Sequence, residues 1–268
     1  GVAMDLGPCV APMGEALPAV KYDTSTKIVA FTDRTLERLR ALPGVTAVAS
    51  ASTLPLATGT TQWSVDIDGN PDALRERSSP YIVIGSGDIF NAMGIRLLRG
   101  RAFGPDDRET SDPVVVISEA MVKEFFPGQD PIGKRLHPSG TTPWMTIVGV
   151  AADVRPQALS EAPKPMYYVL TSQLALMAGF ADAEMQFVVR TQTDPRAVMN
   201  AAQNAVWEED RALAVDNIRT LEEVVTGSVA RPRFAATVLG AFGASALLLA
   251  VIGVYGVLSY SMERRRRE

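Results

Sequence analysis

Residues 234–262 read FAATVLGAFGASALLLAVIGVYGVLSYSM, a run of 29 residues without a charged side chain. Because the apolar interior of a bilayer is about 30 Å thick, a helix needs roughly 20 apolar residues to cross it. The centre of the run, residues 246–252, is apolar on every side of a helix, as contact with lipid requires. The sequence therefore predicts a transmembrane helix over residues 231–262. The alternative is a buried helix of a soluble protein, which rarely runs past about 25 residues without a polar face.

The charges beside this run predict its direction across the membrane. Clustered arginines follow it, and clustered Lys and Arg mark the cytoplasmic flank of a membrane span. We therefore expect residues 1–230 to lie outside the cytoplasm and residues 263–268 to begin a cytoplasmic segment. The arginines that carry this topology are Arg264, Arg265, Arg266 and Arg267.

Small residues recur at four-residue spacing along the predicted helix. Such spacing allows the backbones of two membrane helices to approach closely, so it favours packing within a bundle over a solitary anchor. The alternative is that Gly and Ala are simply common in membrane helices. The candidate packing residues are Gly240, Ala244, Gly253 and Gly256.

The rest of the chain is acidic. Without residues 263–268, which hold four arginines and two glutamates, 22 basic and 28 acidic residues remain, a net charge of −6. This balance argues against a nucleic-acid partner, which is bound through an excess of Lys and Arg. Cys9 is the only cysteine, so no disulfide can form within the chain, and the redox compartment stays open.

No catalytic, cofactor or metal site can be assembled from the residues. His137 is the only histidine, and a zinc site or a Ser-His-Asp triad needs further partners that the sequence lacks. The carboxylates of residues 106–112 are predicted to form a solvated loop, with a calcium site as the alternative. The segment Gly128–Arg135 has the glycine spacing of a phosphate loop, but it lacks the Ser or Thr after lysine, and Pro131 removes a backbone donor. It is predicted to be a turn.

Helical and strand patterns alternate before residue 230. Residues 174–183 lack a clear period and are predicted to be a loop, and residues 1–18 are either a first strand or a tether. Helices are predicted at residues 25–42, near 89–94, at 119–126, from 195 and from 220; strands are predicted at 45–52, 63–67, 81–84, 114–117, 146–150, 167–170, 185–190 and 215–218.

Several segments together resemble the FtsX-like permease family of ABC transporters, with an extracytoplasmic region like the MacB periplasmic core domain. Each motif alone is modest, but their order and spacing make the resemblance specific, and it runs from about Leu17 to Glu268. The matching stretches are Leu36–Val45, Ser52–Leu56, Met93–Phe103, Val116–Glu119, Phe126–Leu136, Ile147–Arg155 and Gly253–Tyr260.

The resemblance implies an α+β fold: an extracytoplasmic, two-lobed mixed domain over residues 1–230, followed by one transmembrane helix. Its flanks would form a porter-like βαβ part, and an inserted α/β lobe would occupy about residues 88–182. Family permeases continue past the matching Arg267-Glu268, so the chain is expected to be a piece of a longer permease. The localisation implied is the bacterial inner membrane, with the domain on the periplasmic side.

The implied function is a non-catalytic permease subunit without cofactors. It would couple ATP hydrolysis by a separate ABC ATPase subunit to motion or export across the membrane. The implied partners are that ATPase, a second permease copy, a periplasmic adaptor and membrane lipid. Two other classes remain open from the residues: a single-pass ectodomain that senses a ligand or partner, and a membrane-tethered hydrolase. The transported substrate is not predicted.

Overall fold

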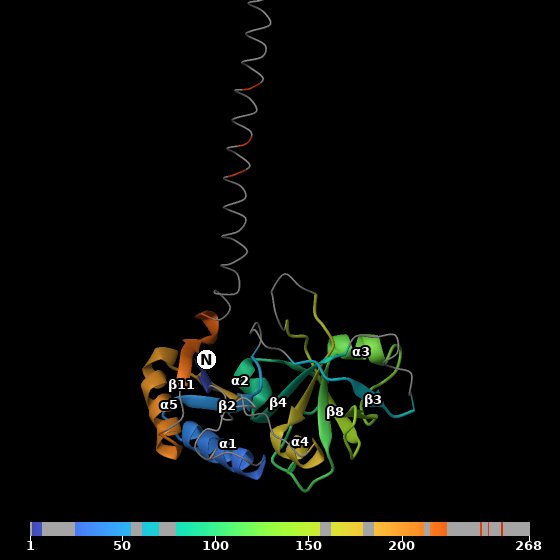
Figure 1. Cartoon of the computed structure of the whole chain (residues 1–268), viewed down its shortest axis with the longest axis horizontal. Coiled ribbons are helices and arrows are strands. Elements are labelled where there is room, and N and C mark those ends of the chain that lie inside the picture. The colour runs from blue at the N-terminus through green and yellow to red at the C-terminus, as the bar shows by residue number, and fades with distance from the viewer. Residues whose placement is uncertain are drawn as a thin grey trace, which may run out of the picture. The chain divides into compact units, whose positions relative to one another are not determined.

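One mixed β-sheet of eleven strands organises the described part of the chain (Figure 1). The computed structural model describes residues 2–6, 25–54, 61–69, 79–155, 162–178, 185–211 and 215–223, with Phe242, Ala246 and Gly253 as single positions. Contacts divide the chain into residues 1–224 and residues 225–268. The sheet and the five helices named below belong to the first of these.

The strands appear in the sheet in an order that differs from their order in the chain. The path is β11-β1-β10-β2-β4-β9-β6-β8-β7-β3, and β5 pairs with β8 beside it. The strands are β1 (Val2–Leu6), β2 (Val45–Ala51), β3 (Val65–Ile67), β4 (Tyr81–Gly87), β5 (Leu97–Gly100), β6 (Val114–Ser118), β7 (Arg135–Pro138), β8 (Met145–Ala151), β9 (Met166–Leu170), β10 (Met185–Thr191) and β11 (Val215–Thr220). The helices are α1 (Ser25–Arg40), α2 (Ile89–Met93), α3 (Glu119–Phe125), α4 (Thr171–Ala178) and α5 (Pro195–Glu209).

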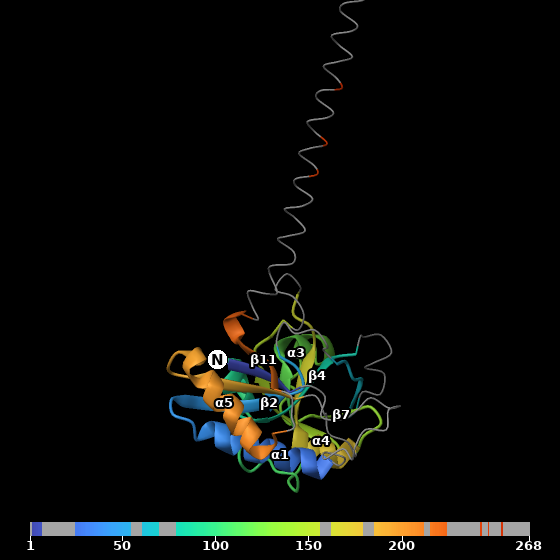
Figure 2. The same ribbon diagram turned by 60° about the vertical axis from the view of Figure 1, so that its left-hand side comes forward.

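Four strands at one end of the sheet and two helices form a split βαβ arrangement. The chain runs β1-α1-β2, leaves this part, and returns as β10-α5-β11. The four strands lie in the order β11-β1-β10-β2, and every neighbouring pair is antiparallel. Helices α1 and α5 lie side by side, as Figures 1 and 2 both show. Phe31 of α1, Phe187 of β10 and Val206 of α5 belong to one buried cluster that holds this part together.

The other end of the sheet is formed by β4, β9, β6, β8, β7 and β3, in that order along the sheet. β4 runs parallel to β9, β9 antiparallel to β6, and β6 parallel to β8. The apolar run Val114–Ile117 becomes the central strand β6, buried along its whole length, as a continuous β-branched stretch predicts. A second cluster packs Met121 and Phe125 of α3 against Ile117. A third cluster covers the opposite face around α2.

Local signals predicted most helix starts correctly. Asp194 accepts a hydrogen bond from Arg196 N at 3.0 Å, with Pro195 at the first helical position of α5. Thr220 and Glu223 form a capping box: Glu223 N donates to Thr220 Oγ1 at 3.1 Å, and Thr220 N donates to Glu223 Oε2 at 3.0 Å. These two starts confirm the sequence predictions.

The loop predicted over residues 174–183 is wrong for its first part, because residues 171–178 form α4. Thr171, Gln173 and Leu174 are all buried although they lie on different sides of the helix, since it contacts α1 as well as β4 and β9. A helix covered on several sides shows no stripe of 3.6-residue period, and this explains the failure of the pattern. The open choice at the N-terminus is settled for residues 2–6, which form a strand.

The predicted transmembrane helix lies almost entirely outside the described residues. Of that segment, Phe242, Ala246 and Gly253 are helical and exposed. Across the described ranges, no helix has the length and apolar character that a membrane crossing requires. The transmembrane helix therefore stays a prediction.

Candidate functional site

Three segments that carry the family resemblance meet on strand β8. Arg101 N donates to Val148 O at 2.9 Å, and Ala152 N donates to Arg96 O at 2.8 Å. From another side, Gly133 N donates to Ile147 O at 2.9 Å. We call residues 96–101, 130–134 and 147–152 the β8 cluster. Its backbone groups are bonded to one another, so the motifs build a junction between segments.

Two glycines allow this junction to close. Gly100 and Gly149 are partners in the β5–β8 ladder. A Cβ atom on Gly149 would lie 2.2 Å from Arg101 O, and one on Gly100 would lie 2.2 Å from Val148 O. No side chain fits at either position, which accounts for the glycines in these two motifs.

The segment that has the spacing of a phosphate loop is a turn, as predicted. Its backbone N–H groups are already engaged: Ile132 N donates to Asp130 Oδ1 at 3.1 Å, and Lys134 N donates to Pro131 O at 3.0 Å. The Lys134 ammonium lies 5.6 Å from the centre of the Phe126 ring. A phosphate loop needs its N–H groups directed at the ligand, whereas here those of Ile132 and Lys134 bond within the turn and that of Gly133 bonds Ile147 O.

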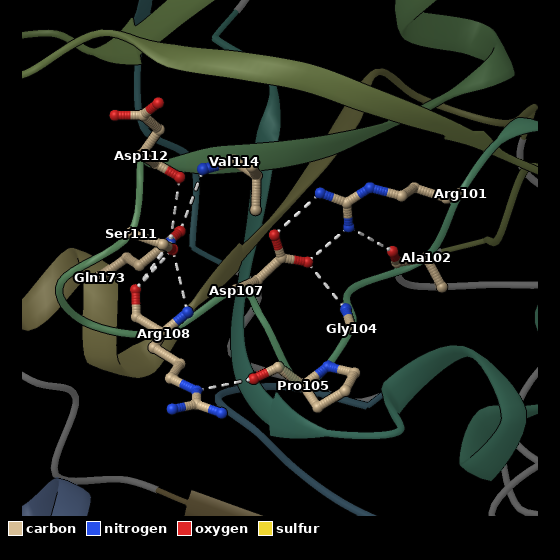
Figure 3. Close-up of polar contacts among 10 residues, drawn as sticks. All are labelled: Arg101, Ala102, Gly104, Pro105, Asp107, Arg108, Ser111, Asp112, Val114 and Gln173. Atoms are coloured by element: carbon tan, nitrogen blue, oxygen red, sulfur yellow. Dashed lines mark hydrogen bonds and ion pairs between the residues drawn. The ribbon is translucent and has the colours of Figure 1, made fainter.

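An ion pair closes the loop after β5 (Figure 3). The Arg101 guanidinium donates to both oxygens of Asp107, at 2.5 Å and 2.9 Å, and Gly104 N donates to Asp107 Oδ2 at 2.7 Å. The Asp107 side chain is only 6% exposed. The hydrogen bonds from Arg101, together with the one from Gly104, hold the pKa of the Asp107 carboxyl below its usual value. Asp107 is therefore a structural anchor within a loop that was predicted to be solvated.

The amide of Gln173 fixes the rest of the same loop from α4 (Figure 3). Its Oε1 accepts from Val114 N at 3.0 Å, and its Nε2 donates to Arg108 O and to Ser111 Oγ, both at 3.1 Å. Gln173 is 2% exposed, so these bonds form out of contact with water. For the calcium alternative, the ranges that the structure describes bring together no three His, Cys, Asp or Glu side chains as a metal site.

Two side chains fasten the start of α3. Ser118 Oγ accepts from Met121 N at 3.2 Å and from Met166 N at 3.0 Å, so one hydroxyl joins the helix start to β9. Asp153, from the motif after β8, accepts from Ala120 N at 2.6 Å. The predicted N-cap at Ser118 is confirmed, and Asp153 is an additional cap that the sequence alone did not reveal.

Charged side chains link α1 to α5. Arg34 Nε lies 2.8 Å from Glu209 Oε2, and Arg38 contacts both Glu209 at 2.5 Å and Glu208 at 2.6 Å. The hydrogen bonds from the two arginines lower the pKa of Glu209. The link joins the two helices of the split βαβ part at the surface.

His137 lies in β7, between β8 and the edge strand β3. Its ring centre is 4.2 Å from that of Trp144 in an edge-on contact, and Nδ1 is 3.0 Å from Pro138 O. The side chain of Asp66, on the neighbouring strand β3, is 3.7 Å away. These contacts describe a packed histidine beside the edge strand.

Most residues predicted from the membrane segment lie outside the described residues: Gly240, Ala244, Gly256, Arg264, Arg265, Arg266 and Arg267, as does Cys9. Gly253 is helical, with no atom within 4 Å of a Cβ built on it. Sequence reasoning missed the roles of Asp107, Gln173 and Asp153. For Asp107, the arginine six residues earlier in the chain was a usable signal.

Two curated proteins resemble the chain in sequence. The chain is 25% identical over 223 residues to the ABC transporter permease YvrN of Bacillus subtilis (strain 168). The aligned region covers 80% of this chain and 54% of YvrN. It is 21% identical over 240 residues to the permease YknZ of the same organism, covering 89% of this chain and 56% of YknZ. The chain thus spans about half the length of the curated relatives it matches.

One solved structure shares the fold. The periplasmic region of MacB from Actinobacillus actinomycetemcomitans superposes with a TM-score of 0.52 at 14% identity, covering 77% of this chain and 82% of that structure. The extracellular domain of the transporter YknZ from Gram-positive bacteria gives a TM-score of 0.49 at 16% identity, covering 80% of this chain and 100% of that structure. The family model of the MacB-like periplasmic core domain matches residues 11–209, and the chain therefore belongs to that family.

Proposed function

We propose that this chain is the extracytoplasmic domain and one transmembrane helix of an ABC transporter permease. Family membership and the two permease relatives support this assignment. In this proposal the domain performs no bond chemistry. It passes motion between the membrane and the outside, driven by ATP hydrolysis in a separate subunit.

One observation carries the mechanical part of the proposal. Val2, at the start of β1, is the register partner of Thr220, at the end of β11. Residues 2 and 220 therefore lie side by side on the sheet. Strand β1 continues the ladder to β10, and α5 packs on β1, β10 and β11. Movement of the segments attached at that place would displace the whole split βαβ part.

The same topology supports a division into two lobes. We propose that β1, α1, β2, β10, α5 and β11 form the porter-like part, and that the inserted lobe occupies about residues 88–182. The buried clusters support such a division, because one holds α1 and α5 to their strands while another holds α3 to β6 and β9.

The membrane segment and the partners complete the proposal. The helix at residues 231–262 would pack in a bundle through its small residues, Gly240, Ala244, Gly253 and Gly256. The arginines 264–267 would lie in the cytoplasm. The partners would be an ABC ATPase subunit, a second permease copy, a periplasmic adaptor and membrane lipid. The comparisons do not favour the alternative of a sensor, since both curated relatives are named as permeases.

Hydrogen exchange in the intact permease–ATPase complex tests the function. We expect trapping of the ATPase with nucleotide and vanadate to change amide protection within residues 2–223. A partner with an inactive ATPase site, which binds but does not hydrolyse nucleotide, serves as the control. If protection in the domain were the same in every nucleotide state while the complex transported substrate, the mechanical proposal would be wrong.

A further inference from the structure

Strand β5 presents one of its edges to solvent. Among the described strands it pairs with β8 alone, and it lies off the path that joins the others. Leu98, Arg99 and Gly100 are all exposed, so this length of the strand is accessible. An exposed edge offers backbone N–H and C=O groups to which a further strand can bond.

A bulge in β5 exposes Leu98. Leu97 is the register partner of Ala151 and Arg99 that of Val150, so Leu98 is the extra residue and has no partner on β8. A bulge leaves its extra residue outside the ladder and changes the direction of side chains. Leu98 is 42% exposed. It therefore offers a partner an apolar side chain together with backbone groups that the ladder does not use.

A second exposed apolar side chain lies near the end of β5. Ile132, in the turn before β7, is 36% exposed, and its Cδ1 atom is 3.1 Å from a Cβ built on Gly100. In the described part of residues 1–224, the exposed large apolar residues are Leu98, Ile132 and Trp207, and the first two flank Gly100. Single exposed apolar residues are ordinary, whereas neighbouring ones mark interaction surfaces.

The segments around this edge are basic, although the chain is acidic. Residues 96–101 and 130–135 together hold five basic residues and one acidic residue, whereas the whole chain has a net charge of −4. Two of these basic side chains pair with acids outside the two segments: Arg101 with Asp107 (Figure 3) and Arg135 with Asp68.

Two further arginines are not held by strong pairs. Arg99 Nη1 lies 3.4 Å from Asp130 Oδ1, and both side chains are exposed, so this pair contributes little to stability. Within the described ranges, the Arg96 guanidinium makes no hydrogen bond or ion pair. We call Arg96, Leu98, Arg99 and Ile132 the β5 edge surface.

The charge of the β5 edge surface selects its occupant. A second copy that paired through β5 would bring Arg96 and Arg99 against the same two arginines, and like charges across neighbouring strands are destabilising. An extended segment with carboxylates would instead place opposite charge on these arginines. Its apolar side chains would contact Leu98 and Ile132 while its backbone bonds along β5. Addition of a strand to a sheet edge is a common mode of peptide recognition.

We propose that the β5 edge surface docks an extended acidic segment of a partner protein, which adds as a strand to β5. Because side chains alternate along a strand, the segment has acidic residues alternating with apolar ones. The short length of β5 limits the contact to a few residues, so binding depends on the charges. Docking requires only the folded domain and is independent of the proposed transport function.

Peptide binding to the full chain, held in nonionic detergent micelles, tests the proposal. The probe is a fluorescent peptide in which Glu and Val alternate, and fluorescence anisotropy measures its binding. A peptide with Lys in place of Glu is expected to bind about tenfold more weakly or worse, because it meets the arginines with like charge. A Glu peptide that is N-methylated at alternate residues cannot bond a strand edge and is expected to lose about tenfold in affinity.

Substitutions in the β5 edge surface locate the binding. Arg99→Glu reverses one charge and Leu98→Ser removes the apolar contact, and each is expected to weaken binding of the Glu peptide by about tenfold. Arg99→Glu is also expected to strengthen binding of the Lys peptide, which a merely structural change would not do. Arg211→Glu, at an exposed arginine after α5, is the matched control and is expected to leave binding of both peptides unchanged.

Folding of the variants is checked at the β5–β8 ladder. The amides of Arg101 and Ala152 bond Val148 O and Arg96 O, and their protection from hydrogen exchange is expected to be unchanged. Arg99→Gln, which only removes the charge, is used if Arg99→Glu does not fold. It is expected to weaken binding of the Glu peptide in the same direction.

The docking edge would be overturned if the parent chain did not bind the Glu peptide, or if the Glu, Lys and N-methylated peptides bound equally. Equal binding by the parent and the Arg99 variant would have the same consequence. Displacement of the peptide by phosphatidylglycerol added to the micelles would assign the surface to lipid headgroups and would also overturn the proposal. These outcomes do not concern the response of the domain to nucleotide, so they leave the proposed function standing.

Discussion

Gly100 and Gly149 face each other across β5 and β8, and each lies against the backbone of the opposite strand. We predict that Gly149→Ala destabilises the domain by about 1–3 kcal/mol, because its Cβ would lie 2.2 Å from Arg101 O and β5 would have to move away. Chemical denaturation measures this change. Gly104→Ala is the control, because its Cβ would lie 3.9 Å from an Asp107 oxygen, at ordinary contact distance. An equal loss of stability in the Gly104 and Gly149 variants would contradict the prediction.

Asp107 makes stability depend on pH. Its pKa is lowered in the folded state, so the stabilisation is fully present above the unfolded value of about 3.9 and is lost as the pH falls through the lower folded value. We predict that Asp107→Asn lowers stability by about 1–2 kcal/mol at pH 7 and that the difference closes below about pH 4. Unfolding curves at several pH values measure it. Asp112→Asn, whose carboxylate points away from the network in Figure 3, is the matched control and is expected to leave the stability at pH 7 close to that of the parent.

Gln173→Leu removes the amide that holds the loop of residues 105–112. Val114 N would lose its acceptor in a buried position, at a cost of about 1–3 kcal/mol. We expect faster hydrogen exchange at Val114 and faster tryptic cleavage after Arg108, whose carbonyl would keep its bonds from Ser111 but lose the one that ties the loop to α4. Ser172→Ala, one position earlier on α4, is the matched control. Unchanged cleavage in the Gln173 variant would show that the loop is held by other contacts.

The Ser118 hydroxyl accepts two backbone donors, so its removal affects two elements at once. Ser118→Ala is predicted to destabilise by about 1–2 kcal/mol and to weaken exchange protection at both Met121 and Met166. Ser118→Thr keeps the hydroxyl and is expected to retain most of the protection. Loss of protection at Met121 alone would mean that the bond to β9 is not significant.

Features that depend on neighbours in sequence could be predicted, and features that depend on distant segments could not. Ser118 and Asp194 cap their helices through bonds to residues two or three positions away, so their local sequence is informative. Gln173 bonds Val114, 59 positions earlier, and no periodic pattern encodes that contact. Helix α4 was missed because tertiary contacts bury several of its sides.

The candidate site also combines features that the sequence predicts with features that only the fold reveals. The motif segments were recognised from their sequences, yet their meeting on β8 required the fold. The sequence does not distinguish Asp107 from the other carboxylates of its loop, because its burial depends on how the loop returns to Arg101. The residues predicted to pack and orient the membrane helix stay predictions, since apart from Gly253 they lie outside the described residues.

The pairing of Ala51 with Gln186 has a consequence for the design of a smaller protein. The chain leaves the split βαβ part at the end of β2 and returns to it at the start of β10, and these two strands are antiparallel neighbours. A short Asn-Gly turn could therefore replace residues 52–185 and join the strands as a hairpin. The sheet topology thus allows the intervening segment to be deleted. The edge of β2 that pairs with β4 would then be exposed and would need a charged residue to prevent aggregation.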